Sequence, residues 1–441
     1  MADKIVQCGY MSGDTYSAAA LLKLFPGTRI ILIQDTKGSG AYADKSGTIL
    51  KIYQETGVHA QVEVLNVSHR SQLRNTTIWD AVKDKYQTGA KVPPKALRLG
   101  DEDDEDTLLK KALHALCWRY EPKGKWPRSI TAVTGLLANK WREQPGLTER
   151  TIAAAWKVGK LPAEVKFALY EYMAGKFAKT GFENIRKNIL VLWSRQSGKK
   201  GGAHLELDSS YEGIRQLAYY FAVESPRATV LLAGDERNGK LAYLGTQDAH
   251  VIDVSEMWKG PVWTRLFGEA TFLGQFAFFK YLANDYNVIH LGMRSGVLEA
   301  MALLGMETFY LEPVSLETGS GKRMVAFQNN GITYRRIQIN TPPGLTARIV
   351  DQSPKLFSPG IVNSRLSKRA WVHKKNPSFQ DYFGNNNKAA RAFAKMDLLD
   401  EPGSYAEIGD LKGLREKMDF LRGFRESDFN EITSLVGAKM V

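Results

Sequence analysis

The stretch that decides the fold is residues 290–313, which read HLGMRSGVLEAMALLGMETFYLEP. An apolar run into Gly292 predicts a strand, Arg294-Ser295-Gly296 predicts a turn, and the residues that follow have helical spacing. A second apolar run, 308–311, predicts the next strand. This order places the free N–H groups and the positive dipole end of a helix at the carboxyl edge of a parallel sheet. Such an arrangement is typical of a phosphate-binding site.

The same alternation of apolar runs and helical spacing occurs on both sides of this stretch. It is present in about the first 90 residues and again from Asn188 onward, whereas residues 107–182 between the two blocks have helical spacing only. The predicted strands are 4–9, 29–34, 62–67, 189–193, 228–234, 249–254, 288–291 and 308–311. Repeated strand–helix–strand units predict a parallel sheet covered by helices. The sequence therefore predicts an α/β protein of two Rossmann-like lobes with a helical insert between them.

The length of 441 residues exceeds what one hydrophobic core usually serves, so at least two domains are expected. We expect an N-terminal lobe over 1–100, the helical insert over 101–185, and a C-terminal lobe over 186–345. A basic loop and helices over 346–441 are expected to pack back on the N-terminal lobe. Within the C-terminal lobe, the pattern predicts one long aromatic helix over 262–284.

The turn at residues 294–296 carries the most informative side chains of the predicted phosphate site. Gly296 lets a ligand approach the backbone, and Ser295 can cap the helix and donate a hydrogen bond to a phosphate. Glu299 projects from the first helical turn toward ligand hydroxyl groups. A capping box between Ser295 and Glu299 is the structural alternative.

The run Arg294-Ser-Gly-Val-Leu-Glu-Ala300, followed by Gly305 and the strand 308–311, resembles the donor-binding motif of GT-B-type glycosyltransferases. The resemblance covers residues 186–313 by motif order and the N-terminal half by general architecture. It implies that residues 186–345 bind a nucleotide-sugar donor, that residues 1–100 bind an acceptor of unknown identity, and that no cofactor takes part. An epimerase or hydrolase that acts on sugar nucleotides is a weaker alternative, because it would use the same phosphate site.

Two further features fit this resemblance. Arg195 and Lys199 lie in a polar, glycine-containing loop at the end of a predicted strand, where cations would stabilise the leaving diphosphate. A flexible basic loop without this role remains the alternative. Trp258 lies between a strand and the long aromatic helix, where the family seats the nucleobase; it can stack on a base or belong to the core.

Asp14 is the candidate catalytic base, because it follows the first strand at the carboxyl edge that faces the other lobe. Its carboxylate could accept the proton of an acceptor hydroxyl group as the sugar carbon is attacked. The alternative is a turn or helix cap before the helix that begins at Tyr16.

The charge pattern leaves a non-enzymatic alternative open. The net charge is +13, although residues 101–106 form a wholly acidic run. Basic residues outnumber acidic ones by 16 to 5 over 123–200 and by 8 to 1 over 360–395. Such segments attract anionic partners, so a nucleic-acid-binding or assembly protein on a Rossmann-like scaffold is the second hypothesis.

Several classes of protein are excluded by missing patterns. The sequence has no apolar run long enough for a membrane span, and its first residues lack the pattern of an export signal, which predicts a cytoplasmic location. It also has no zinc-type cluster of Cys and His, so no metal is expected. Residues 319–323 fail the Walker A pattern, since Leu316 replaces the first glycine and Arg323 replaces the magnesium-binding Ser or Thr.

Overall fold

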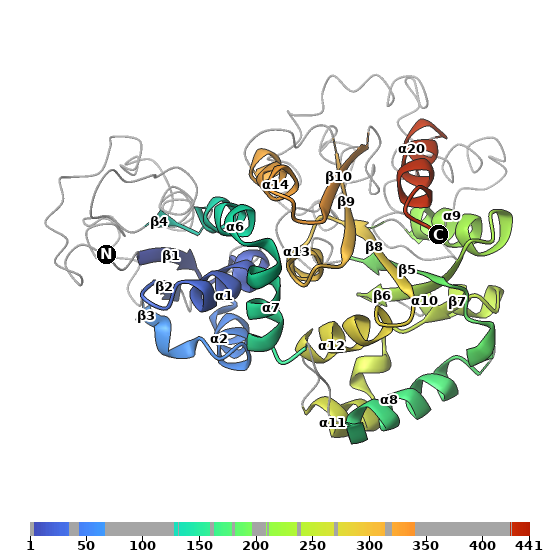
Figure 1. The fold of residues 1–441 in the computed structure, drawn as a ribbon, viewed down its shortest axis with the longest axis horizontal. Helices are drawn as coiled ribbons and strands as arrows, with labels where there is room; N and C mark the ends of the chain where they lie inside the picture. The colour runs from blue at the N-terminus through green and yellow to red at the C-terminus, as the bar shows by residue number, and fades with distance from the viewer. Residues whose placement is uncertain are drawn as a thin grey trace, which may run out of the picture.

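The computed structural model describes residues 4–34, 44–66, 128–130, 132–158, 163–178, 181–195, 209, 211–235, 240–268, 272–313, 320–339, 424 and 426–441. Within these residues the chain forms an α/β structure with two sheets, and every pair of neighbouring strands is parallel. Figure 1 shows the two sheets side by side, with helices α1 and α13 between them. The predicted α/β class with parallel sheets is therefore confirmed. The acidic run 101–106 and the basic segment 360–395 lie outside the described residues.

The N-terminal sheet has the strand order β3-β2-β1-β4. Its strands are β1 (Lys4–Cys8), β2 (Arg29–Gln34), β3 (Val62–Asn66) and the short β4 (Arg128–Ser129). The connecting elements are η1 (Ser12–Asp14), α1 (Thr15–Leu24), α2 (Ser46–Glu55) and η3 (His59–Gln61). Because β4 pairs with β1, part of the predicted insert belongs to the N-terminal sheet.

The C-terminal sheet has six strands in the order β10-β9-β8-β5-β6-β7. They are β5 (Asn188–Ser194), β6 (Ala228–Gly234), β7 (Val251–Asp253), β8 (Asn287–Met293), β9 (Glu307–Pro313) and β10 (Tyr334–Ile339). If β5 is numbered 1 and β10 is numbered 6, the order read from β7 to β10 is 3-2-1-4-5-6. This is the strand order of dinucleotide-binding Rossmann sheets. Strands β5 and β6 are almost wholly buried and rich in Leu, Val and Ala, as expected for central parallel strands.

Helices cover both faces of the C-terminal sheet. The outer face carries α9 (Tyr211–Tyr219), the π-helical turn η7 (Tyr220–Glu224), α10 (Lys240–Gln247) and α20 (Glu426–Gly437). The inner face carries α12 (Phe272–Leu282), α13 (Gly296–Leu303) and α14 (Ser320–Asn329). Helix α20 therefore packs on the C-terminal sheet through Ile432 and Val436, and not on the N-terminal lobe as expected for residues 346–441. Residues 346–423 of that segment lie outside the described residues.

The helices between the two sheets divide their contacts between the lobes. Helices α6 (Ala132–Glu143) and α7 (Pro145–Ala155) pack against α1, and α8 (Ala163–Lys176) packs against α11 (Pro261–Phe267). Short turns η5 (Phe182–Asn184) and η8 (Met257–Lys259) complete the described elements. The single long helix predicted over 262–284 is instead the pair α11 and α12. The first of these ends at Phe267, and the next residue, Gly268, has a positive φ of 75°, which suits glycine and breaks the helix.

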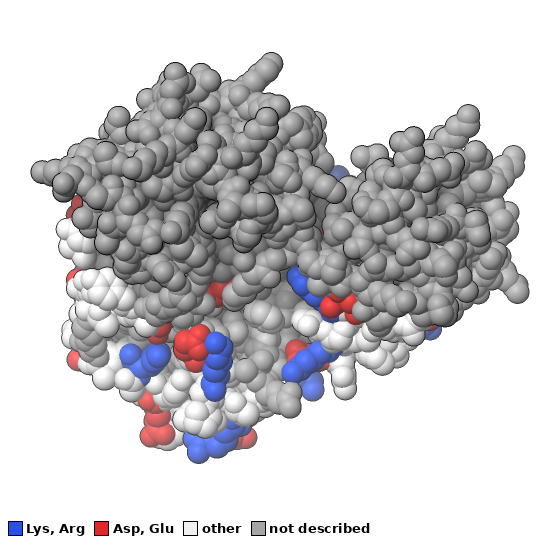
Figure 2. All heavy atoms as spheres, turned by 180° about the vertical axis from the view of Figure 1, so that it is seen from behind, with Lys and Arg blue, Asp and Glu red and all other residues white. Residues whose placement is uncertain are grey.

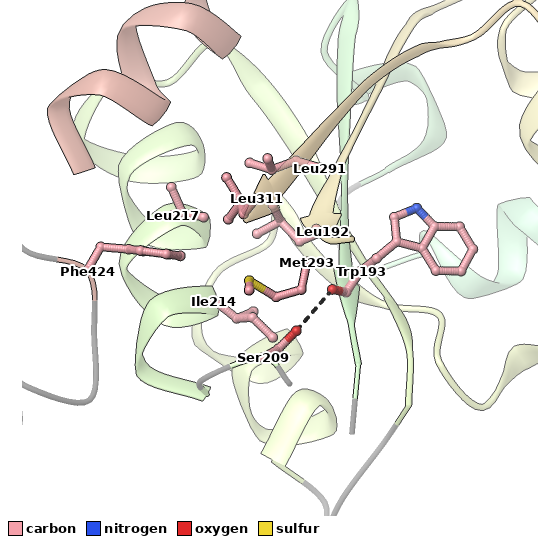
Figure 3. A pocket seen from close by; sticks show the side chains of 10 residues that line it. Leu192, Trp193, Ser209, Ile214, Leu217, Leu291, Met293, Leu311 and Phe424 are labelled. Carbon is pink, nitrogen blue, oxygen red and sulfur yellow. Dashed lines mark hydrogen bonds between the residues drawn. The ribbon is translucent and has the colours of Figure 1, made fainter. Parts of the chain in front are cut away.

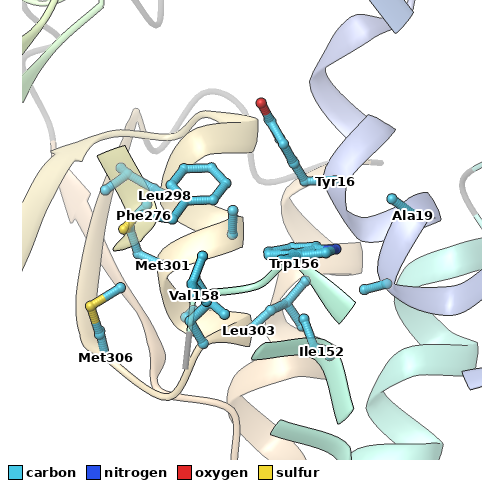
Figure 4. Close-up of a cluster of buried hydrophobic side chains, with 14 of the residues drawn as sticks. Tyr16, Ala19, Ile152, Trp156, Val158, Phe276, Leu298, Met301, Leu303 and Met306 are labelled. Carbon is cyan, nitrogen blue, oxygen red and sulfur yellow. The ribbon is translucent and has the colours of Figure 1, made fainter. Parts of the chain in front are cut away.

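One continuous hydrophobic core joins the two lobes. It runs from β1 and β2 through α1, α6 and α7 to the inner-face helices α12, α13 and α14. At its centre, the ring of Tyr16 from α1 meets the rings of Trp156 and Phe276 edge-on, at centroid distances of 5.9 and 5.1 Å (Figure 4). The lobes are therefore packed on each other, rather than separated by an open cleft at this level.

Candidate functional site

The order of the C-terminal sheet reverses between β5 and β8, and this switch point is where open α/β sheets bind ligands. On one side of the switch point, β5 ends at Ser194 and is followed by Arg195. On the other side, β8 is followed by Arg294. The turn that follows β1 in the N-terminal lobe packs against α13 beside this edge. The candidate site is therefore the carboxyl edge of β5 and β8.

The turn after β8 starts α13 with a side-chain cap. Ser295 is the N-cap residue in extended conformation, and its Oγ accepts a hydrogen bond from the N–H of Leu298 at 3.4 Å. The third helical position is thus Leu298, so Glu299 lies one residue too late for the capping box considered from the sequence. Glu299 instead accepts a hydrogen bond from the Oγ of Ser17 in the N-terminal lobe, at 2.8 Å.

Gly296 is in contact with the N-terminal lobe. A Cβ atom at this position would lie 2.0 Å from the carbonyl oxygen of Gly13. The absence of a side chain at Gly296 therefore permits a close backbone contact between the lobes, and this side of the residue has no open space for a ligand.

Asp14 ends the short 3-10 turn after β1 and directly precedes α1. It is buried and is the N-cap residue of α1, as the helix-cap alternative expects, although its side chain makes no capping hydrogen bond to that helix. Burial, and after it the nearby charge of Asp14, raises the pKa of Tyr53. Since the turn containing Asp14 packs on α13 and its Gly13 meets Gly296, the backbone of Asp14 lies close to the β8 turn.

Arg294 is buried and belongs to a charged cluster that crosses three strands. Its Nη1 lies 2.8 Å from Oε1 of Glu312 on β9, and Nε of Arg336 on β10 lies 2.8 Å from Oε2 of the same carboxylate. We call Arg294, Glu312 and Arg336 the triad. Glu312 has no exposed surface, and the side chains of Arg294 and Arg336 are 7% and 12% exposed.

Two buried tyrosines lie beside the triad on the same face of the sheet. The rings of Tyr310 on β9 and Tyr334 on β10 are stacked at a centroid distance of 4.3 Å, and neither hydroxyl group has a hydrogen-bond partner. We call them the tyrosine pair. Burial raises the pKa of both phenols, and the negative charges of Glu299 and Glu312 add to this effect.

Of the two predicted basic residues after β5, the structure describes Arg195 but not Lys199. The backbone N–H of Arg195 donates to Oγ of Ser209 at 3.0 Å, and the N–H of Ser209 donates to the carbonyl oxygen of Arg195 at 2.7 Å, which fixes the end of β5. Lys199 lies outside the described residues.

Trp258 belongs to the core. It is 5% exposed, and the rings of Trp263, Phe278 and Phe279 meet it edge-on at centroid distances between 4.9 and 5.8 Å. Trp258 is thus surrounded by other side chains, as expected for a core residue and not for one that stacks on a nucleobase.

A small cavity lies on the outer face near the carboxyl ends of β5, β8 and β9 (Figure 3). Its volume is about 20 Å³, which is room for one water molecule. Its walls are mainly apolar, and the ring of Phe424 lies at its side toward α9. Gln216 fixes Phe424 by accepting a hydrogen bond from its N–H at 2.8 Å. This cavity is too small and too apolar to hold a phosphate or a sugar.

Sequence reasoning missed three charged residues, of which two lie at the carboxyl edge and one, Arg336, lies in the middle of β10. Glu312 and Arg336 complete the triad, and Asp235 directly follows β6, where its N–H donates to the carbonyl oxygen of Ser194 at 2.9 Å. The end of the second strand is where Rossmann sheets place the carboxylate that binds ribose hydroxyl groups. An acid directly after an apolar strand was the available signal for Asp235, and an acid inside an apolar strand was the signal for Glu312.

Comparison with known proteins does not add a family. Neither the protein-family models, nor the curated proteins, nor the solved structures contain a match to this chain. Among the described residues, no three His, Cys, Asp or Glu side chains form a group that could hold a metal ion. No helix in the described part of the chain is long and apolar enough to cross a membrane. The function therefore has to be argued from the geometry of the carboxyl edge.

Proposed function

We propose that the protein transfers a sugar from a nucleotide-sugar donor to an acceptor, in the manner of the GT-B-type enzymes that it resembles. The observation that carries this proposal is the 3-2-1-4-5-6 order of the C-terminal sheet, whose switch point has Arg195 on one side and Arg294 on the other. Cations at this position favour a ligand with a diphosphate, and the turn with Asp14 lies beside them.

In this proposal each group at the edge has a chemical role. The leaving nucleoside diphosphate gains negative charge as the glycosidic bond breaks, so Arg195 and Arg294 stabilise the transition state more than the ground state. Asp235 accepts hydrogen bonds from ribose hydroxyl groups. Asp14 accepts the proton of the acceptor hydroxyl group as that group attacks the sugar carbon. Ser295 completes the phosphate contacts from the start of α13.

The packing of the lobes changes how the donor would enter. Gly296 and Glu299 both contact the N-terminal lobe, so we place the donor over the ends of β5 and β8 and not on the far side of α13. Because α1 and α13 share one core, we expect the site to be formed without a large opening of the lobes.

The test is a thermal-shift and calorimetric screen of nucleoside diphosphates and nucleotide sugars. A ligand at about 100 times its dissociation constant should raise the stability by roughly 2.7 kcal/mol. We expect Asp235→Asn to weaken binding of the best nucleotide about tenfold, because a hydrogen bond to a charged group is lost. The matched control is Asp285→Asn, which removes a carboxylate just before β8, at the opposite edge of the sheet. Equal binding by both variants would contradict the proposed site.

The nucleic-acid hypothesis is the competing outcome of the same screen. Its basic segment 360–395 lies outside the described residues, and on the face shown in Figure 2 the described basic and acidic side chains are interleaved. Stabilisation by single-stranded RNA or DNA alone, lost at higher salt, would favour that hypothesis. Product analysis with a bound nucleotide sugar would separate transfer from epimerisation or hydrolysis. The cytoplasmic location stays a prediction.

A further inference from the structure

The last described segment lies across the outer face of the C-terminal sheet. Helix α20 packs on the apolar core of this face, and Phe424 belongs to the same core. At the amino end of β5, Nδ2 of Asn188 donates to the carbonyl oxygen of Val441, and the N–H of Val441 donates to Oδ1 of Asn188, both at 3.0 Å. Near the carboxyl end of β5, Phe424 lines the small cavity. We call Phe424 and residues 426–441 the C-terminal strap, and this strap contacts both ends of β5.

The strap is attached to α9 at its carboxyl-edge end (Figure 3). Oε1 of Gln216 accepts a hydrogen bond from the N–H of Phe424 at 2.8 Å, and Nε2 of Gln216 donates to the carbonyl oxygen of Phe424 at 3.4 Å. The ring of Phe424 lies against Gly213 in the first turn of α9, where an added Cβ would lie 2.9 Å from Cε2 of the ring. Phe424 therefore contacts the first two turns of α9 through its backbone and its ring.

The start of α9 is in turn bonded to the candidate site. Ser209 lies two residues before α9, and its Oγ accepts a hydrogen bond from the N–H of Arg195 at 3.0 Å. The N–H of Ser209 donates to the carbonyl oxygen of Arg195 at 2.7 Å, and its Oγ lies 3.4 Å from the carbonyl oxygen of Trp193. Arg195 is the cation on the β5 side of the switch point. A continuous series of contacts thus runs from Phe424 through α9 and Ser209 to Arg195.

There is little free space along this series of contacts. The cavity lined by Phe424, Ser209 and Ile214 has a volume of about 20 Å³, so a movement of the ring cannot be absorbed by an empty region. Close-packed interiors transmit such movements to their neighbours. Removal of the ring would enlarge the cavity and free the first turn of α9 to shift.

We propose that the C-terminal strap positions Arg195 at the switch point. Phe424 and Gln216 are positioning residues, because they hold the start of α9 and thereby the two hydrogen bonds between Ser209 and Arg195. The part of this proposal that concerns a bound diphosphate rests on the proposed function, whereas the link from Phe424 to Arg195 rests on contacts within the chain alone.

The first test compares Phe424→Ala with Leu244→Ala by hydrogen–deuterium exchange of the full chain. Leu244 belongs to the same apolar core but lies on α10, so both variants lose buried apolar surface and should melt at lower temperature. In Phe424→Ala, peptides with Arg195 and Ser209 should exchange at least about tenfold faster, because local opening becomes easier there, while β6 stays unchanged. Equal acceleration of these peptides in both variants would overturn the proposal, since the strap would then only stabilise the lobe.

The second test reaches the same contact from α9. Gly213→Ala places a Cβ against the ring, so it should lower the melting temperature and accelerate exchange at Ser209. In the Phe424→Ala background the Cβ has room, and the same substitution should raise the melting temperature, because alanine favours a helix more than glycine does. A shift of equal sign and size in the two backgrounds would show that the two residues are not coupled and would overturn the proposal.

The third test separates the strap from the proposed function. Isothermal titration measures the affinity of the wild type and both alanine variants for the nucleoside diphosphate found in the screen. Phe424→Ala should raise the dissociation constant about three- to tenfold, because the ligand must then order Arg195 itself, and Leu244→Ala should leave it unchanged. Faster exchange at Arg195 with unchanged affinity would overturn the positioning role and leave the proposed function in place. Faster exchange in a protein that binds no nucleoside diphosphate would support the strap and count against the proposed function.

Discussion

The two faces of the C-terminal sheet are built from alternate residues of the same strands, yet they differ sharply. On β8, β9 and β10 the buried side chains of the outer face are apolar, and the ion pair of Arg335 and Glu307 lies where these strands begin; the apolar residues are Ile289, Leu291, Met293, Phe309, Leu311, Ile337 and Ile339. The inner face of these strands carries His290, Arg294, Tyr310, Glu312, Tyr334 and Arg336. Both faces are covered by helices, so burial alone does not account for the difference. The polar groups belong to the face that meets the N-terminal lobe, and the outer face shows that an apolar arrangement can be packed on these strands.

The largest expected effect comes from breaking the triad. Glu312→Ala leaves two buried arginines without a counter-ion, so we expect the free energy of unfolding to fall by about 3 to 5 kcal/mol. Denaturant unfolding followed by circular dichroism measures this loss.

A triple variant tests whether the inner face can be made like the outer one. We expect Arg294→Met with Glu312→Leu and Arg336→Met to recover most or all of the stability lost in Glu312→Ala, because no uncompensated charge remains. A triple variant as unstable as Glu312→Ala would show that the ion pairs of the triad themselves stabilise the fold.

The next largest loss of stability is expected from a substitution at the contact between the lobes. The Cβ atom of Gly296→Ala would meet the carbonyl oxygen of Gly13 at 2.0 Å, so the lobes must shift apart. Overpacking of this kind typically costs about 1 to 3 kcal/mol. The control is Gly135→Ala in α6, where an added Cβ meets nothing within 4 Å and should stabilise the helix by about 0.5 to 1 kcal/mol. Equal melting temperatures for the two variants would rule out a tight lobe contact.

His290 makes the inner face sensitive to acid. Burial lowers the pKa of His290 to about 3, and its Nδ1 accepts a hydrogen bond from Nε1 of Trp193 at 3.0 Å. The unfolded chain protonates this residue below its ordinary pKa of about 6.5 and the folded chain does not. Stability therefore falls as the pH decreases from about 6.5 toward 3, by up to about 1.4 kcal/mol per pH unit.

The matching variant is His290→Gln, which keeps a hydrogen-bond acceptor but does not titrate in this range. Urea unfolding of both proteins at pH 7.5 and 5.5 should show the wild type losing about 1.4 kcal/mol more than the variant. Equal losses would mean that His290 is protonated as easily in the folded protein as in the unfolded chain.

The smallest effect concerns the hydrogen bond across the lobes. Ser17→Ala removes the donor to Glu299 and should lower the free energy of unfolding by about 1 kcal/mol. Thr246→Ala, which removes an exposed hydroxyl group bonded within its own helix, is the control and should change stability less. A Ser17 variant as stable as the wild type would show that the lobes do not depend on this bond.

The fold was largely predictable because its signals are local. Apolar runs and helical spacing located β1, β2, β3, β5, β6, β7, β8 and β9, and parallel pairing follows from their alternation with helices. Strand β10 was not predicted, because its polar residues interrupt the apolar run. The pairing of β4 with β1 was missed, because a strand of two residues has no period to detect. The packing of α20 on the C-terminal sheet was also missed, since an amphipathic helix does not specify which apolar surface it covers.

The candidate site was predictable only in part. The turn at Arg294 and the acid at Asp14 were found because both follow predicted strands at the carboxyl edge. What the sequence could not reveal is the partner of each group. That Arg294 faces Glu312, and that Gly296 touches Gly13, depends on register and on lobe packing, which are set by contacts far apart in the chain.

The packing of α1 also affects how the protein is made. Residues Thr15–Leu22 are all buried, and Ser17 reaches Glu299, 282 residues further along the chain. At about 5 to 20 residues per second, a ribosome needs roughly 15 to 60 seconds to synthesise that interval. During this time the first helix has its own sheet but not its second covering surface. The nascent N-terminal lobe is therefore expected to be a client for chaperones until α13 has been synthesised.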